Sequence, residues 1–407
     1  MNHITLSAIL LAACSATTPL HAAESEAPLQ PDSSTTTVSR IVEKGLVPVS
    51  LIVTGFIVKG EDTHFRSLRN DYVPSYKHPY DNYTQFLPAA VMLGMKACGV
   101  KGRSSWGRML VSDAFSTAIM AATVQYMKMN TNVHRPDGSN NHSFPSGHTA
   151  TAFMTATMLT KEYGHISPWI GIGSYTVATA TGIMRVTNNK HWLSDVLTGA
   201  GIGILATEVG YWLGDVIFRD RGIRRIPTHE TFSSKDAPSF LGLYLGMNVP
   251  LSHYDIDEEH TFRTSSGSSA GLEGAWFFCP YVGVGGRFTV SNTHIITNGN
   301  EAEKNNFDII SMMGGAYFSY PLGSRWLVGS KLLVGGINYP TLHLDDGTTV
   351  DKRDGIGFGS GLSIAYKARE HYGMRLFLDY NLLPSHSKKS SEWMNMLSAG
   401  TSFMVTF

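Results

Sequence analysis

The chain has 407 residues, enough for two domains, and its 32 basic residues balance its 32 acidic residues, so its charge does not point to nucleic acid. Its three cysteines, Cys14, Cys98 and Cys279, are too few for a disulfide framework and lack the spacing of a zinc site. Many of the 41 glycines lie in the last third of the chain, and this unevenness indicates two different architectures.

The N-terminal segment, 1–23, is predicted to be a cleaved export signal, because residues 4–20 are apolar or small and a small-residue cleavage site follows them. A positively charged start is missing, since the first Lys or Arg is Arg40. The alternative is a lipoprotein signal, because Leu-Ala-Ala-Cys ending at Cys14 resembles a bacterial lipidation box. Residues 24–40 are rich in Ser, Thr and Pro and predict a flexible lead-in.

The segment 41–218 has helical periodicity and is predicted to form an all-α domain. A membrane span needs roughly 20 mostly apolar residues, whereas the charge-free stretches here are shorter or rich in Gly, Ser and Thr. We therefore predict a compact helical bundle with close contacts between small residues, resting on a membrane; a six-span membrane bundle is the alternative. The expected helices are 44–58, 84–98, 108–129, 148–163, 167–187 and 192–218.

Three fixed cations in this segment suit a phosphate pocket. Six residues separate Lys128 from Arg135-Pro136, and Arg185 lies further along the chain. Arginine grips a tetrahedral oxyanion through paired N–H donors, and lysine adds a point charge. Between them, Ser146 and the backbone N–H of Gly147 would begin a helix, where free N–H groups and the helix dipole favour an anion.

Two histidines accompany these cations. His191 and Asp195 are four residues apart and share one face of a helix. The carboxylate can hold one imidazole nitrogen and leave the other as a nucleophile. His148, beside the expected anion cradle, is the candidate general acid for the leaving oxygen. Taken alone, the block Pro145-Ser146-Gly147-His148 could be a turn with a helix cap. Taken alone, the His191 and Asp195 pair could be a surface or core hydrogen bond.

The three blocks together resemble the type 2 phosphatidic acid phosphatase and vanadium haloperoxidase superfamily over roughly residues 84–217. The resemblance implies an acid phosphatase/haloperoxidase-type bundle in which His191 is the nucleophile that becomes phosphorylated, His148 the general acid and Asp195 the partner of His191. Met184 stands where the family usually has serine, which affects one supporting hydrogen bond but not the core set. The phosphate would be bound by Lys128, Arg135, Ser146, Gly147 and Arg185.

After a polar link, 219–238, the period changes from 3.6 to 2, and the segment 239–407 is predicted to form an antiparallel eight-stranded β-barrel of the outer-membrane type. Long links follow the first, third, fifth and seventh strands. The fold class is thus two-domain, α then β; a soluble periplasmic β-sandwich is the alternative for the second part. The expected strands are 239–250, 269–279, 281–291, 307–320, 326–339, 355–368, 372–384 and 393–407, with Glu273, Arg287, Lys331, Arg375 and Asp379 facing inward.

The link limits where the two domains lie. Fully extended, residues 219–238 span at most ~70 Å, too short to join inner-membrane helices to an outer-membrane barrel. We therefore expect a barrel in the bacterial outer membrane with the phosphatase domain in the periplasm against that membrane. A multi-span protein of the inner membrane, with a different β domain, is the alternative.

These predictions lead to a metal-independent phosphatase without a cofactor, because no carboxylate cluster suits a divalent ion. The expected partners are a membrane and a phosphorylated lipid: lipid A phosphate, undecaprenyl diphosphate, phosphatidylglycerol phosphate or phosphatidic acid. The outer-membrane location favours lipid A. The alternatives are a vanadate-dependent haloperoxidase and a non-enzymatic barrel receptor or adhesin with a helical periplasmic domain.

Overall fold

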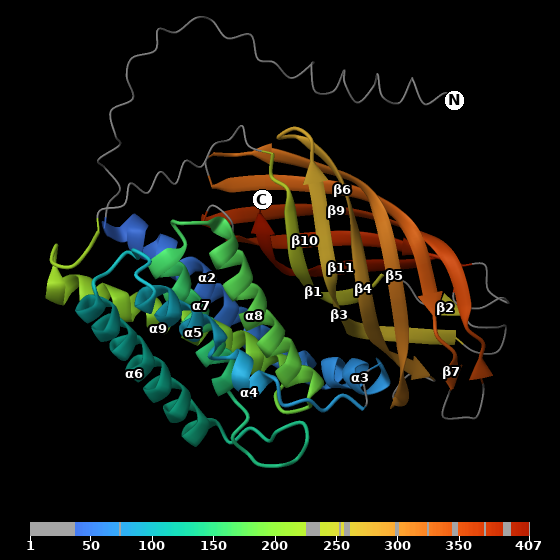
Figure 1. Cartoon of the computed structure of the whole chain (residues 1–407). Helices are drawn as coiled ribbons and strands as arrows, with labels where there is room; N and C mark the ends of the chain where they lie inside the picture. Colours follow the sequence, from blue (N-terminus) through green and yellow to red (C-terminus); the bar gives the residue numbers. More distant parts are fainter. Residues whose placement is uncertain are drawn as a thin grey trace, which may run out of the picture.

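The computed structural model has a helical part followed by a β-barrel (Figure 1). The predicted signal 1–23 and the lead-in as far as residue 36 lie outside the described residues, and the predicted domain boundaries stay predictions. The structure describes residues 37–72, 75–224, 237–251, 254–255, 261–297, 301–323, 325–343, 349–369, 372–385 and 392–406.

The helical part contains all six helices that the periodicity predicts, with ends shifted by a few residues. Two further helices, α3 and α4, escape the prediction because α3 is mostly polar and α4 is a single turn. The helices are α2 (Thr37–Val58), α3 (Asp62–Tyr72), α4 (Asp81–Thr84), α5 (Leu87–Ala97), α6 (Trp106–Thr131), α7 (Gly147–Tyr163), α8 (Pro168–Thr187) and α9 (Leu193–Phe218), with a 3₁₀ turn at Lys59–Glu61.

Helix α9 forms the centre of the bundle and packs closely on α7. A Cβ added at Gly199 would lie 2.5 Å from the carbonyl oxygen of Ser146, and one at Gly203 would collide with the carbonyl oxygen of Ala150. These contacts confirm the predicted small-residue packing, and they hold the start of α7 against the start of α9. Among the described helices, α9 alone is long and apolar enough to cross a membrane, and 78% of its apolar window is buried within the protein.

Eight long antiparallel strands close into a barrel, which confirms the predicted architecture and excludes the open β-sandwich. The hydrogen-bonded order is β1-β11-β10-β9-β6-β5-β4-β3, and pairing of β1 with β3 closes it. The strands are β1 (Phe240–Pro250), β3 (Thr261–Phe277), β4 (Val282–Thr297), β5 (Glu301–Pro321), β6 (Trp326–Tyr339), β9 (Arg353–Arg369), β10 (Tyr372–Leu383) and β11 (Met394–Thr406), with short strands β2 (Tyr254–Asp255), β7 (Leu342–His343) and β8 (Thr349–Val350).

One detail of the strand prediction is wrong. Only residues 298–300 separate β4 from β5, so the third link is not long. The strands β3, β4 and β5 continue past the predicted ends through polar sequence, where no apolar alternation marks them. The backbone ladder persists there because strand hydrogen bonds do not require apolar side chains.

The barrel interior is closed by charged side chains that the sequence places inward. Lys331 Nζ lies 2.6 Å from Glu273 Oε1 and 2.9 Å from Asp379 Oδ2, and Arg287 lies 2.6 Å from the same Asp379 oxygen. The Arg375 guanidinium lies 3.6 Å from the centre of the Phe240 ring. This confirms the inward network and fits an eight-stranded barrel whose interior is filled by side chains.

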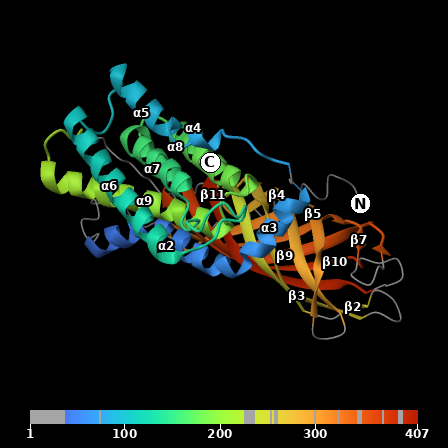
Figure 2. The same ribbon diagram turned by 90° about the horizontal axis from the view of Figure 1, so that it is seen from below.

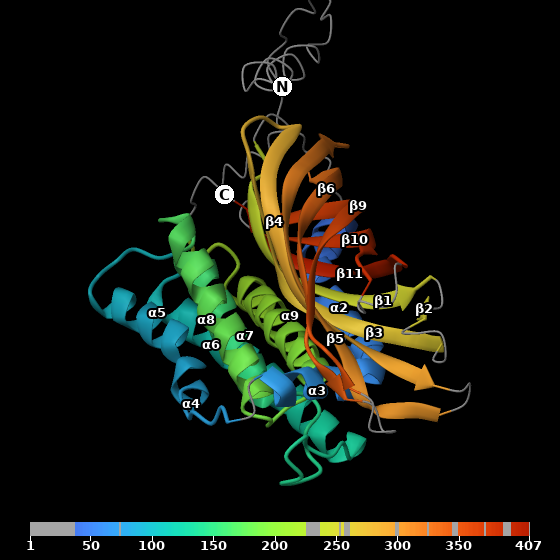
Figure 3. The same ribbon diagram turned by 90° about the vertical axis from the view of Figure 1, so that its right-hand side faces the viewer.

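The helical part lies beside the barrel wall, as Figures 2 and 3 show from two directions. One continuous apolar cluster joins Leu51 of α2 and Leu197 of α9 to Leu245 of β1, and it extends to Ala270 and Val290 on the next strands. The contact is made by outward-facing apolar side chains of the wall and apolar side chains of the helices. The predicted position of the helical domain, in the periplasm against the outer membrane, stays a prediction.

Candidate active site

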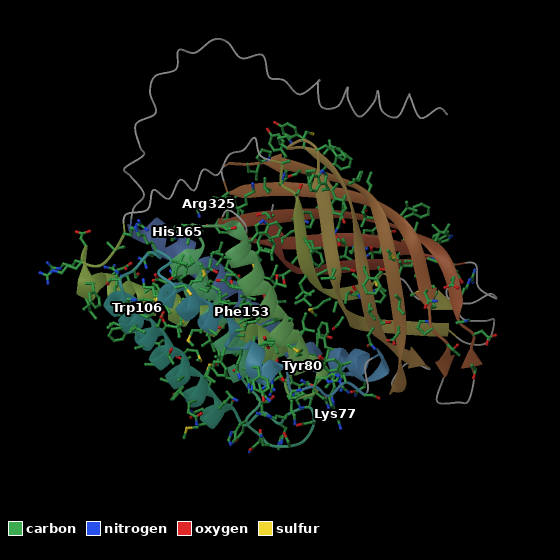
Figure 4. The ribbon with its side chains drawn as sticks, in the orientation of Figure 1. Lys77, Tyr80, Trp106, Phe153, His165 and Arg325 are labelled. Carbon is green, nitrogen blue, oxygen red and sulfur yellow. The ribbon has the colours of Figure 1, made fainter. Side chains whose placement is uncertain are left out.

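The predicted site residues lie where four helices meet: the ends of α6 and α8 and the starts of α7 and α9. Short α4 and the loop 132–146 complete this end of the bundle. Side chains crowd the region in Figure 4, below the labelled Tyr80, which directly precedes α4. The first two sequence blocks thus contribute one helix terminus each to the same place, and the third contributes two, the end of α8 and the start of α9.

Helix α7 begins at the candidate anion cradle. Ser146 caps the helix: its Oγ accepts from the Thr149 backbone N at 3.4 Å and from the Thr149 hydroxyl at 2.9 Å. The Ser146 hydroxyl hydrogen therefore stays available for an acceptor. A Cβ added at Gly147 would lie 4.0 Å from Lys128 Cε, so Gly147 leaves room beside that cation.

His191 and Asp195 form the buried pair that the spacing predicts. Their Nδ1 and Oδ2 atoms are 3.1 Å apart, and Oδ2 also accepts from the Trp192 backbone N at 3.0 Å and from the Ser143 hydroxyl. The Ser146 backbone N donates to the Asp195 carbonyl oxygen at 3.0 Å, which ties the pair to the anion cradle. These contacts hold the Asp195 carboxylate in place, and the carboxylate in turn orients the His191 ring through Nδ1.

The three cations face this pair. Burial, followed by the nearby Arg185 and Lys128, lowers the pKa of His191 to about 4, against the opposing effect of Asp195. Burial and Arg185 also lower the pKa of Arg135. Arg185 forms an ion pair of 2.6 Å with Asp81. The Nε atoms of Arg135 and Arg185 are buried without a hydrogen-bond partner, which suits a site built for an anion.

Three residues at the site were missed by the sequence reasoning. Asp81 pairs with Arg185, Asn82 accepts from His148 Nε2 at 2.9 Å, and Ser143 donates to Asp195. None belongs to a spaced block, and Asp81-Asn82 precedes the segment of family resemblance. The only available signal was an Asp at the start of a helical turn.

A fourth unpredicted contact ties the site to α3. Asp62 accepts from the Ser194 backbone N at 3.0 Å and from the Ser194 hydroxyl. Ser194 lies between His191 and Asp195 in the sequence. The start of α3 is therefore fixed beside the candidate catalytic pair.

This arrangement suits transfer of a phosphoryl group through a histidine. It combines a neutral, buried imidazole held by a carboxylate, a second histidine and a cradle of cations and helix N–H groups. Among the described residues, no group of three or more His, Cys, Asp or Glu side chains could hold a metal ion.

Comparisons with known proteins place the site in a family. Residues 110–218 match the model of the PAP2 superfamily, and this segment is therefore a domain of that superfamily. The lipid A 1-phosphatase of Porphyromonas gingivalis is 48% identical over 171 residues, which cover 42% of this chain and 38% of that protein. The chain thus spans about two fifths of the length of the curated relative that it matches.

Solved structures resemble each part separately. Aquifex aeolicus LpxE is 21% identical and covers 35% of this chain and 92% of its own, with a TM-score of 0.29. The outer membrane protein OprG of Pseudomonas aeruginosa is 13% identical and covers 42% of this chain and 94% of its own, with a TM-score of 0.32.

Proposed function

We propose that this protein is a metal-independent phosphatase that removes phosphate from a membrane lipid, and that this lipid is lipid A. The observation that carries the proposal is the buried His191–Asp195 pair facing Lys128, Arg135 and Arg185 at the start of α7. The similarity to a lipid A 1-phosphatase supports the choice of lipid.

In the proposed mechanism the unprotonated Nε2 of His191 attacks the phosphorus atom. A P–N bond forms while the P–O bond to the lipid breaks, and His148 gives a proton to the departing oxygen. Asn82 holds Nε2 of His148, which leaves Nδ1 to carry that proton. Water then attacks the phosphohistidine, His148 takes the proton of that water, and inorganic phosphate leaves. Arg135, Arg185 and the α7 N–H groups stabilise the charge on the equatorial oxygens.

The substrate is tested by phosphate release from detergent-solubilised protein. Vesicles would carry lipid A, undecaprenyl diphosphate, phosphatidylglycerol phosphate or phosphatidic acid, one lipid at a time. We expect the highest kcat/KM with lipid A. Faster release from one of the other three lipids would show that lipid A is the wrong substrate, but the protein would still be a phosphatase. No release from any of the four lipids would contradict the phosphatase function. A cellular phenotype that depends on the barrel alone would favour a receptor or adhesin.

Chelators and vanadate should separate this mechanism from its alternatives. We expect full activity in EDTA, because the proposed site uses cations and histidines in place of a metal. Vanadate should inhibit, because it adopts the trigonal-bipyramidal geometry of the phosphoryl transition state. Activity that EDTA removes and a divalent ion restores would contradict the mechanism. Halide oxidation by the vanadate-loaded protein would support a haloperoxidase instead.

The acidic limb of the pH profile should lie well below the ordinary histidine range. An imidazole attacks only when neutral, and the pKa of His191 is lowered from 6.5 to about 4, so activity should fall as the pH drops through about 4. Asp195 raises this pKa, so Asp195→Asn should move the limb lower still. The measurement is kcat/KM against pH with p-nitrophenyl phosphate for both proteins. Identical limbs near 6.5 would contradict the assignment of His191 as the attacking group.

The barrel provides the membrane anchor in this proposal. Large apolar side chains are exposed on every long strand except β11, including Leu272, Leu332, Ile356 and Leu376, as a lipid-facing wall requires. We therefore propose an outer-membrane location, reached by export through the predicted signal 1–23.

A further inference from the structure

The helical bundle has two distinct ends. The site end holds Asp81, the loop 132–146 and the starts of α7 and α9. The far end holds Trp106 at the start of α6 and His165 after α7, together with the end of α9. Figure 4 shows Trp106 and His165 at one end of the bundle, and Lys77 and Tyr80 at the other.

The barrel also has two distinct ends. The links 278–281, 322–325 and 370–371 are short, and the strand ends that they join lie at one end of the barrel, where β1 begins. The links 251–260, 340–352 and 384–393 are longer, and the strand ends that they join lie at the opposite end, as do the ends joined by the short link 298–300. Outer-membrane barrels keep short turns in the periplasm and long loops outside the cell, so the long-loop end faces outward.

The chain fixes the direction of the bundle against the barrel. Helix α9 runs from the site to the far end, and β1 starts at the short-turn end with Phe240. Figure 4 shows His165 at the same side of the molecule as Arg325, which belongs to a short turn. The far end of the bundle therefore lies at the periplasmic end of the barrel.

The site end lies correspondingly in the long-loop half of the wall. Ser268 of β3 donates to Glu61, just before α3, at 3.3 Å. Ser268 pairs with Met247, which follows Phe240 by seven positions, or about 24 Å along the strand. Asp62, the neighbour of Glu61, is bonded to Ser194 at the site. The catalytic pair is thus connected to the outward half of the barrel wall.

The bundle exposes apolar side chains on several of its helices. They occur on α2, α5, α6, α8 and α9, among them Val53, Phe56, Val91, Leu110, Ile183 and Trp212. A patch of this extent is unusual on a protein surrounded by water.

We propose that the helical domain lies within the outer membrane beside the barrel, and that its phosphate site opens in the outward-facing leaflet. The substrate class is then a phosphorylated lipid whose headgroup faces the outside of the cell, and phosphate is released outward. The identity of the reaction rests on the proposed function, but the orientation rests on contacts alone. This orientation differs from the prediction, made from the length of the link, that the phosphatase domain lies in the periplasm.

The orientation is tested with a maleimide carrying a polymer too large for porins, applied to intact cells. Ser139→Cys, in the exposed loop at the site end, should be labelled. Asp351→Cys, in a long barrel loop, serves as the outward reference. Native Cys98 is exposed beyond the end of α5, at the far end, and should be labelled only after the outer membrane is permeabilised. Peptide mass spectrometry separates the sites.

Labelling of Asp351→Cys without Ser139→Cys in intact cells would overturn the proposed orientation, and so would labelling of Cys98 before permeabilisation. Because labelling needs no catalysis, phosphate release from the same variants in detergent distinguishes the two proposals. If the Ser139→Cys variant releases phosphate in detergent but is not labelled in cells, only the proposed orientation is wrong. If it is labelled but releases no phosphate, only the proposed function is wrong.

A crosslink tests the side-by-side docking independently. Glu61→Cys with Ser268→Cys should be joined in native membranes by a short bifunctional thiol reagent, since their wild-type side chains meet. The matched control pairs Glu61→Cys with Leu362→Cys, which is exposed on β9, four strands round the wall from β3. Equal crosslinking of both pairs, or of neither, would contradict docking on this face of the barrel.

Discussion

Replacing His191 by alanine is expected to abolish phosphate release from every substrate, a loss of more than about 10⁴-fold in kcat. The variant retains the three cations, so it should still bind vanadate, but it lacks the nitrogen that forms the P–N bond. Steady-state release and a rapid-quench experiment with radiolabelled phosphate provide the measurement. The wild-type protein should trap label on His191, and the variant should trap none.

His148→Ala makes the informative comparison. A lost proton donor typically costs 10²–10⁴-fold, and the cost should shrink with p-nitrophenyl phosphate, whose leaving group needs little protonation. His134→Ala is the matched control, because that histidine is exposed and only its backbone carbonyl is used, by Trp192. Near-normal activity of His191→Ala, or label trapped on a different residue, would contradict the assigned roles.

The sequence predicted the centre of the candidate site because its chemistry is concentrated in short spaced blocks. His191 and Asp195 share a helix face by their spacing alone, and the structure brings them within 3.1 Å. Asp81 and Asn82 could not be found in this way. They approach Arg185 and His148 across 104 and 66 positions of the chain, and no local pattern records such a tertiary contact.

The barrel was predictable for a different reason. Strand alternation assigns each side chain to one face, so Arg287 and Asp379 could be placed inside before their partners were known. The docking of the helices could not be predicted, because Leu243 and Leu245 have the same outward, apolar character whether lipid or a helix covers them. Only the three-dimensional arrangement distinguishes these two environments.

Asp379→Ala is expected to destabilise the barrel by roughly 3–5 kcal/mol, the usual cost of removing one partner from a buried ion pair. Asp379 is fully buried and accepts from Arg287, Lys331 and the Tyr244 hydroxyl. Glu273 still balances one of the two cations in the variant, but the other loses its counter-charge inside the wall. The measurement is urea unfolding of the vesicle-inserted protein, followed by the gel shift between folded and heated forms.

The matched control is Asp354→Ala, because Asp354 accepts from Asn338 on the exposed side of a strand pair. Its unfolding midpoint should change little, by the equivalent of about 0.5 kcal/mol or less. Adding Arg287→Met to Asp379→Ala removes one uncompensated charge and should recover part of the loss. If the two single variants unfold at the same urea concentration, the interior network does not stabilise the barrel. Loss of stability without loss of phosphate release in detergent would show that the catalytic helices fold independently of the wall on which they dock.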